Sequence, residues 1–226
     1  IKENWQMERV RRATMDRMDH PDDVVRGWAL DIIREKEYRE ALPRLRKFLD
    51  SKDLVRRYAA VRALPDLDGE DAIPALKRAA RQDSSSEVRA AAIHGLGRWF
   101  DRPRVRQVIL AALRDEDEYV RGWALNVVAD KRYRKALPQV RRLLDSPDPD
   151  VRYDAVRALV QIKGAGALPT LLELLETDDS EIVRECIIRS VTLIHPRDPS
   201  AAKLLLRGLK DSSEEVRAAS AKLLRK

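Results

Sequence analysis

The chain has 226 residues, of which 37% are charged and 44% hydrophobic, and its formal net charge is +7. This mixture is too apolar for intrinsic disorder and typical of amphipathic helices, and no uncharged apolar run is long enough to span a membrane. The first residues lack the apolar stretch of a secretory signal, and the single cysteine, Cys186, excludes an internal disulfide framework. A cytoplasmic protein without a membrane partner is therefore the simplest expectation.

Seven two-helix units are predicted along the chain, at residues 1–35, 41–65, 71–99, 102–130, 135–162, 166–194 and 198–226. Each unit carries a signature arginine, which follows Val directly in six units and Val55-Arg56 in the second, and these recur every 31 to 33 residues: Arg26, Arg57, Arg89, Arg121, Arg152, Arg184 and Arg217. A unit of this length cannot bury its apolar face alone and must stack on its neighbours. We therefore predict an all-α solenoid that uses the whole chain as one domain.

The fifth unit shows the pattern most clearly. Its first helix should present one apolar face, formed by Leu137, Val140, Leu143 and Leu144. An acidic turn at residues 145–150 supplies N-cap oxygens to the second helix. That helix is expected to end at Lys163-Gly164 and to bury five apolar residues: Val151, Ala155, Ala158, Leu159 and Ile162.

The two helices carry recurring motifs, Ala-Leu-Pro-x-Leu in the first and Asp-x-x-Val-Arg-x-x-Ala-x-x-Ala-Leu in the second. These motifs resemble HEAT-like repeats, specifically the short repeats first noted in phycobilisome lyases, and the resemblance covers essentially the whole chain. It implies a right-handed superhelix of the armadillo type, with the second helices lining a concave face. Because the family includes enzymes, adaptors and scaffolds, the resemblance implies no particular activity.

The signature arginines follow acidic turns, as Arg152 follows Asp148 and Asp150. An Arg one turn into a helix can donate hydrogen bonds to carboxylates or carbonyls of its own turn or of the adjacent one. We therefore predict that the seven arginines form a structural ladder and do not bind phosphates.

A longer period of 95 residues is superimposed on the shorter one. The stretch from Val25 to Leu30, Val-Arg-Gly-Trp-Ala-Leu, is repeated at residues 120–125, and Tyr58 recurs as Tyr153. The first three units therefore look like a duplicate of the next three. Any surface that one block presents should be presented again by the other.

The residue before each signature arginine is counted as position 0 of its second helix. Apolar spacing then predicts core positions 0, 4, 7, 8 and 11 and outward positions 2, 3, 6 and 10. Ten outward residues are binding candidates for the concave face: Trp28, Asp31, Tyr58, Arg62, His94, Trp123, Asn126, Tyr153, Arg157 and Arg189. Aromatic rings beside Arg and Asn suit a peptide, a nucleic-acid strand or a flat ligand. Alternatively, Gly27 and Gly122 let Trp28 and Trp123 fold over the neighbouring repeat, while Trp99 at position 11 should be buried.

No catalytic set stands out. The histidines His20, His94 and His195 have neither the spacing of a helical zinc pair nor the His-Glu pairing of the HEAT-like di-iron hydroxylases, so no metal or cofactor is expected. Cys186 lies at an outward position near Arg184 and Arg189 in sequence. Such neighbours can lower the pKa of a thiol, but a lone helical cysteine is more often inert.

We predict a non-enzymatic scaffold that binds a protein segment in its concave groove. The expected anchors and polar partners are Trp28, Tyr58, Trp123 and Tyr153 with Arg62, Arg157 and Arg189. Nucleic-acid binding through the net positive charge is the first alternative, although acidic residues interrupt the same groove: Asp31, Asp66, Asp130, Asp154 and Glu185. There are two further alternatives. One is an activity like that of alkylpurine DNA glycosylases, with Trp28 and Asp31 on the concave face. The other is phycobilisome-lyase-like chromophore handling, which rests on the shared repeat alone.

Overall fold

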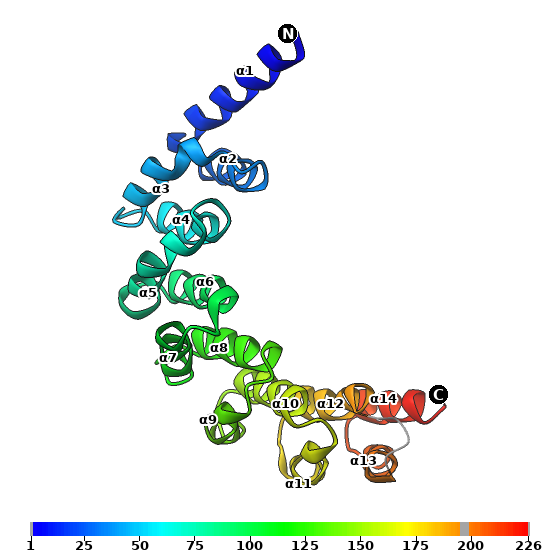
Figure 1. Ribbon diagram of the computed structural model, residues 1–226. Helices are drawn as coiled ribbons and strands as arrows, with labels where there is room; N and C mark the ends of the chain where they lie inside the picture. The colour runs from blue at the N-terminus through cyan, green and yellow to red at the C-terminus, as the bar shows by residue number, and fades with distance from the viewer. Residues whose placement is uncertain (1, 195–198, 226) are drawn as a thin grey trace. The chain divides into compact units, whose positions relative to one another are not determined.

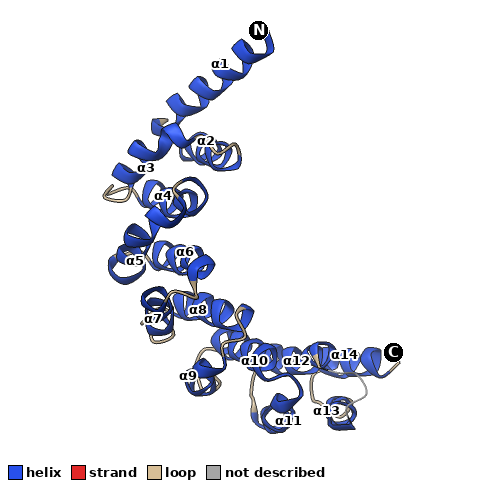
Figure 2. Cartoon of the chain, in the orientation of Figure 1, coloured by secondary structure: helices blue, strands red, loops and turns tan. Residues whose placement is uncertain are grey.

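The computed structural model describes residues 2–194 and 199–225 (Figure 1). These residues form helices joined by short loops and contain no strand (Figure 2). The contacts divide the chain into two compact units, Ile1–Ala112 and Leu113–Lys226, which we call the first and second unit. The start of the last predicted repeat, residue 198, lies outside the described residues.

Seven α-helices are described in the first unit: α1 (Lys2–Asp16), α2 (Asp23–Glu35), α3 (Leu42–Phe48), α4 (Leu54–Leu67), α5 (Ile73–Gln82), α6 (Ser86–Leu96) and α7 (Pro103–Ala112). The described part of the second unit contains α8 (Glu118–Asp130), α9 (Leu137–Leu143), α10 (Pro149–Lys163), α11 (Leu168–Thr177), α12 (Glu181–Ser190), α13 (Pro199–Gly208) and α14 (Glu214–Leu224). Short 3₁₀ helices connect or extend them: Arg17–Asp19, Arg39–Ala41, Gly69–Ala72, Gly97–Trp99, Arg134–Ala136, Gly164–Ala167 and Val191–Leu193.

Within each unit the even-numbered helices, the second helices of the pairs, stack side by side. In the first unit α4 packs between α2 and α6, and in the second unit α10 packs on α8 and α12, and α12 on α14 (Figure 1). The odd-numbered helices form an outer layer, in which α5 contacts α7 and α11 contacts α13. The predicted all-α repeat fold is therefore confirmed.

Helix α10 shows how the local sequence sets one repeat. One carboxylate oxygen of Asp148 accepts hydrogen bonds from the backbone N–H groups of Asp150 and Val151, at 2.8 and 3.2 Å. The helix ends before Gly164, whose φ of 57° is a left-handed conformation that glycine adopts readily. The five residues predicted to be buried are all buried: Val151, Ala155, Ala158, Leu159 and Ile162.

The core of the second helices is wider than the predicted stripe. Position 5 was left out of the predicted core, yet its residues are buried in six repeats: Leu30, Val61, Ile93, Leu125, Val156 and Ile188. Helices α4, α6, α10 and α12 each contact a neighbouring second helix as well as their own first helix, so more than one face is covered. The assignment of core positions was therefore incomplete.

Trp99 was predicted to be buried and is only half-buried. Helix α6 ends at Leu96, and Trp99 belongs to the 3₁₀ helix Gly97–Trp99. A 3₁₀ helix has 3.0 residues per turn, so a position counted at 3.6 residues per turn no longer points at the core.

One stretch, Pro149–Thr177, is long and apolar enough to cross a membrane by length and composition. The structure divides it into α10 and α11, joined by the 3₁₀ helix Gly164–Ala167. Three of its apolar residues, Val156, Leu159 and Leu171, are fully buried in the repeat core. The hydrophobicity of this stretch is thus explained by packing between repeats.

Candidate functional site

The signature arginines share one hydrogen-bond pattern at the start of the second helices. The Nη1 group of each donates to the backbone carbonyl six residues earlier, at 2.7 to 3.0 Å, in all seven repeats. This bond ties the guanidinium to the turn that precedes its own helix.

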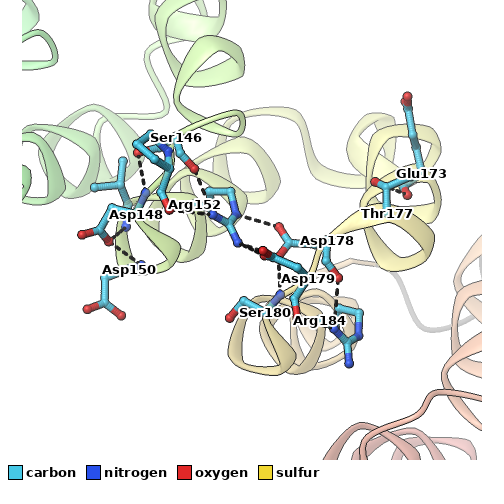
Figure 3. A network of polar contacts seen from close by, with 12 residues as sticks. Ser146, Asp148, Asp150, Arg152, Glu173, Thr177, Asp178, Asp179, Ser180 and Arg184 are labelled. Atoms are coloured by element: carbon cyan, nitrogen blue, oxygen red, sulfur yellow. Dashed lines mark hydrogen bonds and ion pairs between the residues drawn. The ribbon is translucent and has the colours of Figure 1, made fainter.

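Some of these arginines also reach the turn of the next repeat. They form bidentate pairs: Arg57 with Asp83, Arg152 with Asp178 and Arg184 with Asp211. The Nε–Oδ2 distance is 2.9 Å in each pair, and the Nη2–Oδ1 distance is 2.9 to 3.1 Å. Figure 3 shows Arg152 between Ser146 and Asp178. The hydrogen bond to the aspartate raises the pKa of each guanidinium above its ordinary value.

These contacts hold the arginines at the turns, where Arg26 likewise donates to Asp53 at 2.9 Å. Arg26 and Arg89 are buried, and both retain their bonds to turn carbonyls. That the ladder of arginines acts in stability and not in ligand binding stays a prediction.

The ten binding candidates fall into two sets, one in each unit. We call Trp28, Asp31, Tyr58, Arg62 and His94 the first-unit face, and Trp123, Asn126, Tyr153, Arg157 and Arg189 the second-unit face. The structure buries none of the ten. Each set lies on consecutive second helices, α2, α4 and α6 in the first unit and α8, α10 and α12 in the second.

The first-unit face includes a pocket of about 160 Å³ between α2 and α4. Gly27 and Asp31 of α2 and Tyr58, Ala59 and Arg62 of α4 are among its lining residues. A Cβ atom at residue 27 would have nothing within 4 Å. The Arg62 guanidinium carbon lies 5.7 Å from the centre of the Tyr58 ring, which is cation–π geometry. The pocket is therefore open above Gly27 and has a cation at its edge.

Trp28 is 69% exposed. The packing alternative expected this indole to fold over the neighbouring repeat, whereas most of its surface is in solvent. The structure leaves this indole available to a partner.

The other charges near the pocket balance one another. Arg34 approaches Asp31 at 3.5 Å and Asp66 at 3.8 Å, and Arg98 donates to Asp66 from the 3₁₀ helix Gly97–Trp99. Among the described residues, Arg62 makes no ion pair within 4.0 Å. A positive charge without a carboxylate partner therefore stands at the edge of the pocket.

The second-unit face repeats this arrangement with one difference. Arg157 lies 6.0 Å from the centre of the Tyr153 ring, as Arg62 lies over Tyr58. Asp154, however, stands over Gly122, where a Cβ atom would lie 2.7 Å from its Oδ2. Burial raises the pKa of Asp154 to about 6, against the opposing effect of the Arg157 charge. The carboxylate of Asp154 thus fills the space over Gly122.

Trp123 also differs from Trp28. It is half-buried, and its ring meets that of Tyr119 edge to face, with 6.3 Å between centroids and an interplanar angle of 82°. The residue that corresponds to Tyr119 in the first unit is Val24, which has no ring to offer. The two tryptophans, identical in local sequence, are therefore placed in different surroundings.

A third position of the same kind lies between α12 and α14. Here a pocket of about 480 Å³ is lined by Glu185, Arg189 and Lys222 among others and has no aromatic lining residue. Arg189 donates to Glu185 at 2.6 and 2.9 Å. Its charge is thus matched within its own helix.

Cys186 does not face outward as predicted. It is 4% exposed, and its Sγ lies 3.8 Å from the carbonyl oxygen of Tyr153 on the preceding second helix. Burial raises the pKa of the thiol to about 11. Position 3, counted as outward, is where this helix meets its neighbour, so the prediction that Cys186 is outward is wrong.

Among the described residues, no group of three or more His, Cys, Asp or Glu side chains is placed to hold a metal ion. His20 accepts a hydrogen bond from the backbone of Asp22 at 3.2 Å, and His94 is exposed. His195 lies outside the described residues.

Sequence reasoning counted Asp154 only as an interruption of the groove and missed its position over Gly122. The signal was present in the 95-residue period, because Asp154 replaces Ala59 between two otherwise matching tyrosine and arginine positions. Without the stacking of α8 on α10, that difference has no spatial meaning.

Two segments of the chain, residues 12–97 and 105–192, match a family model described as HEAT repeats. A comparison with curated protein sequences finds no match.

Several solved structures share the fold. The complex of CpcE and CpcF of phycocyanin lyase from Nostoc sp. superposes with a TM-score of 0.55 at 16% identity, covering 95% of this chain and 93% of that one. YibA of Escherichia coli gives 0.52 at 18% identity, covering 100% and 98%. An engineered protein gives 0.51 at 21% identity, covering 94% and 67%. At such identities the likeness is one of fold alone.

Proposed function

Because this chain belongs to the HEAT-repeat family, whose stacked helices form extended binding surfaces, we propose that it is a non-enzymatic interaction module. In this proposal the first-unit face binds a segment of a partner protein. The observation that carries the proposal is Trp28, which is 69% exposed on α2, a helix that also lines an open pocket. An exposed Trp next to a pocket and an Arg is the composition in which interface binding energy concentrates.

The first-unit face offers apolar and charged contacts on neighbouring second helices. Trp28 of α2 supplies a large apolar surface, and Arg62 lies within cation–π distance of Tyr58 on α4, where both residues line the pocket. A peptide can place an apolar side chain against the indole and a polar group beside the guanidinium. The α2 and α4 helices hold both groups on rigid backbone, so little ordering is required on binding.

Nucleic-acid binding is supported by the net charge of +7 but not by the local charges of this face. Arg34 and Arg98 are engaged by Asp31 and Asp66, and a continuous basic stripe is what phosphate recognition requires. Neither a chromophore-handling nor a glycosylase activity has a side-chain arrangement on this face that favours it over peptide binding.

The test is selection of displayed random peptides of about 12 residues on the wild-type protein. Affinities of the selected peptides are then measured by fluorescence polarisation for the wild type, Trp28→Ala and Leu206→Ala. Leu206 is 56% exposed on α13 in the second unit and serves as the matched control. We expect Trp28→Ala to weaken binding at least about tenfold and Leu206→Ala to leave it unchanged.

The thermal midpoint of Trp28→Ala should equal that of the wild type, because the indole is mostly in solvent. The proposal is wrong if no peptide is selected, or if the selected peptides bind both variants like the wild type. It is also wrong if a thymidine oligonucleotide binds more tightly than any peptide, with an affinity that falls steeply with salt.

A further inference from the structure

The 95-residue duplication allows the two faces to be compared position by position. Four positions around the first-unit pocket have counterparts in the second unit: Gly27 with Gly122, Tyr58 with Tyr153, Ala59 with Asp154 and Arg62 with Arg157. Three of these pairs are identical residues. The exception is the replacement of a methyl group by a carboxylate.

In the second unit that carboxylate has a defined place. Its Oδ2 lies 2.7 Å from where a Cβ of residue 122 would be, and it feels the positive charge of Arg157. In the first unit the corresponding space above Gly27 is open, and Ala59 and Arg62 line the pocket there. The second unit thus contains an internal acid at a place that the first unit leaves free.

We propose that the first-unit pocket binds the side-chain carboxylate of an acidic partner segment, above Gly27 and beside Arg62. The second unit fills the equivalent place with its own Asp154. This inference rests on the function proposed above and specifies the chemistry of its partner. It also assigns a reason for the difference between the two copies, since the second site is closed by the chain itself.

The electrostatics of the first unit favour such an occupant. The Arg62 guanidinium carbon lies 5.7 Å from the centre of the Tyr58 ring, and a guanidinium can donate two hydrogen bonds to one carboxylate. Asp31, the acid among the lining residues, is engaged by Arg34 at 3.5 Å. The partner's acid would therefore meet an unmatched positive charge.

The apolar part of the partner has a candidate contact on the same helix. Trp28 is exposed on α2, the helix that supplies Gly27 to the pocket, and we place an apolar side chain of the partner against this indole. We therefore infer a segment in which acidic and apolar residues are neighbours. The pocket between α12 and α14 offers neither an aromatic ring nor an unmatched Arg, and we do not expect it to bind this segment.

The test is a titration by calorimetry with a peptide of about 12 residues that alternates Glu and Leu, compared with its Gln–Leu counterpart. We expect the wild type to bind one Glu–Leu peptide and to bind the Gln–Leu peptide at least about tenfold more weakly. Ala59→Asp should abolish binding by placing an acid over Gly27, whereas Ala59→Ser, small and uncharged, should retain it. Asp154→Ala should open the second site and raise the stoichiometry from one to two.

The double variant Ala59→Asp with Asp154→Ala should again bind one peptide, now in the second unit. Asp154→Asn keeps the shape of the side chain and removes its charge, so it shows whether Asp154 blocks the second site by charge or by size. Circular dichroism verifies that each variant folds. Equal affinity for the Glu and Gln peptides, or unchanged binding by a folded Ala59→Asp, would overturn the carboxylate assignment. If Trp28→Ala still weakens binding of the selected peptides in that case, the proposed interaction function stands and only the carboxylate assignment is wrong. If Trp28→Ala has no effect either, both proposals are wrong.

Discussion

Arg152 and Asp178 join two consecutive turns by a bidentate ion pair, in which the Nε–Oδ2 and Nη2–Oδ1 distances are both 2.9 Å. The same guanidinium donates to the carbonyls of Ser146 and Pro147 in its own turn, at 2.9 and 3.2 Å. Asp178 also accepts a hydrogen bond from the backbone N–H of Ser180, at 2.9 Å. One pair of side chains therefore fixes both turns and the distance between repeats.

Removal of this aspartate should destabilise the fold. The Asp178 side chain is 2% exposed, so Asp178→Ala leaves the Arg152 charge poorly compensated, at a cost of about 2–4 kcal/mol in the free energy of unfolding. Urea denaturation followed by circular dichroism measures the change. Arg142→Ala, an exposed position in the same unit, is the control and should change stability by less than about 0.5 kcal/mol. An unchanged urea midpoint for Asp178→Ala would contradict a structural role for the ladder.

An added aspartate should stabilise the one described repeat junction of the second unit that lacks this pair. The residue that corresponds to Asp178 in the turn before α10 is Ser146, and Arg121 of the preceding repeat donates only to the carbonyls of Asp115 and Glu116. Ser146→Asp gives Arg121 the bidentate partner that Arg152 already has. We expect a gain of about 0.5–1.5 kcal/mol, seen as a higher urea midpoint.

The gain should disappear in the double variant with Arg121→Ala, which removes the donor. Equal stabilisation with and without Arg121 would show that the added acid acts through something other than the predicted pair.

Asp154 should make the second unit less stable as the pH rises. Its pKa is about 6 in the folded protein, above the ordinary 3.8, so between these two values the folded state binds more protons than the unfolded state. Stability therefore falls as the pH rises through this window and is level above it. Desolvation is the main cause; the Arg157 charge opposes it and the Asp150 charge reinforces it.

The variant Asp154→Asn removes this dependence. Because the side chain is partly exposed, the gain at neutral pH is on the order of 1 kcal/mol, and it should vanish near pH 4. Thermal unfolding of the two proteins across this pH range measures the difference. A constant difference at all pH values would mean that the carboxylate is not titrating where the structure places it.

Cys186 should be unreactive in the folded protein. Burial raises its thiol pKa to about 11, so almost no thiolate is present at pH 8, and the Sγ is covered by α10. Alkylation by iodoacetamide, followed by mass spectrometry, should be at least about 100-fold slower in buffer than in urea. Rapid alkylation of the native protein would show that position 3 of α12 opens toward solvent.

Much of the fold was predictable because it depends on short-range patterns. The spacing of the signature arginines gave the repeat, and the apolar spacing in α10 identified five residues that are buried. The burial of Leu30 and its position-5 equivalents was missed, since a helix covered on more than one side does not show a single stripe. Trp99 was misplaced because a change from α to 3₁₀ geometry at Gly97 leaves no clear mark in the sequence.

The surface was less predictable because it depends on pairs of residues far apart in the chain. The stretches around Trp28 and Trp123 are identical, yet one indole is exposed and the other meets Tyr119. Likewise, Gly27 and Gly122 differ only through Ala59 and Asp154, which lie on the next second helix. Local sequence carries no information about which of these neighbours is in contact.

The sequence by itself determined the repeat, its helices and the turn chemistry, because each depends on residues within a span of about one repeat. Only the tertiary structure decided which arginines have a bidentate partner, where Cys186 points and which of the two duplicated faces is open. Those properties arise because the second helices pack against one another, so that position 3 of one repeat contacts position 2 of the repeat before it. At that contact Asp154 closes the space over Gly122, and no described side chain fills the space over Gly27.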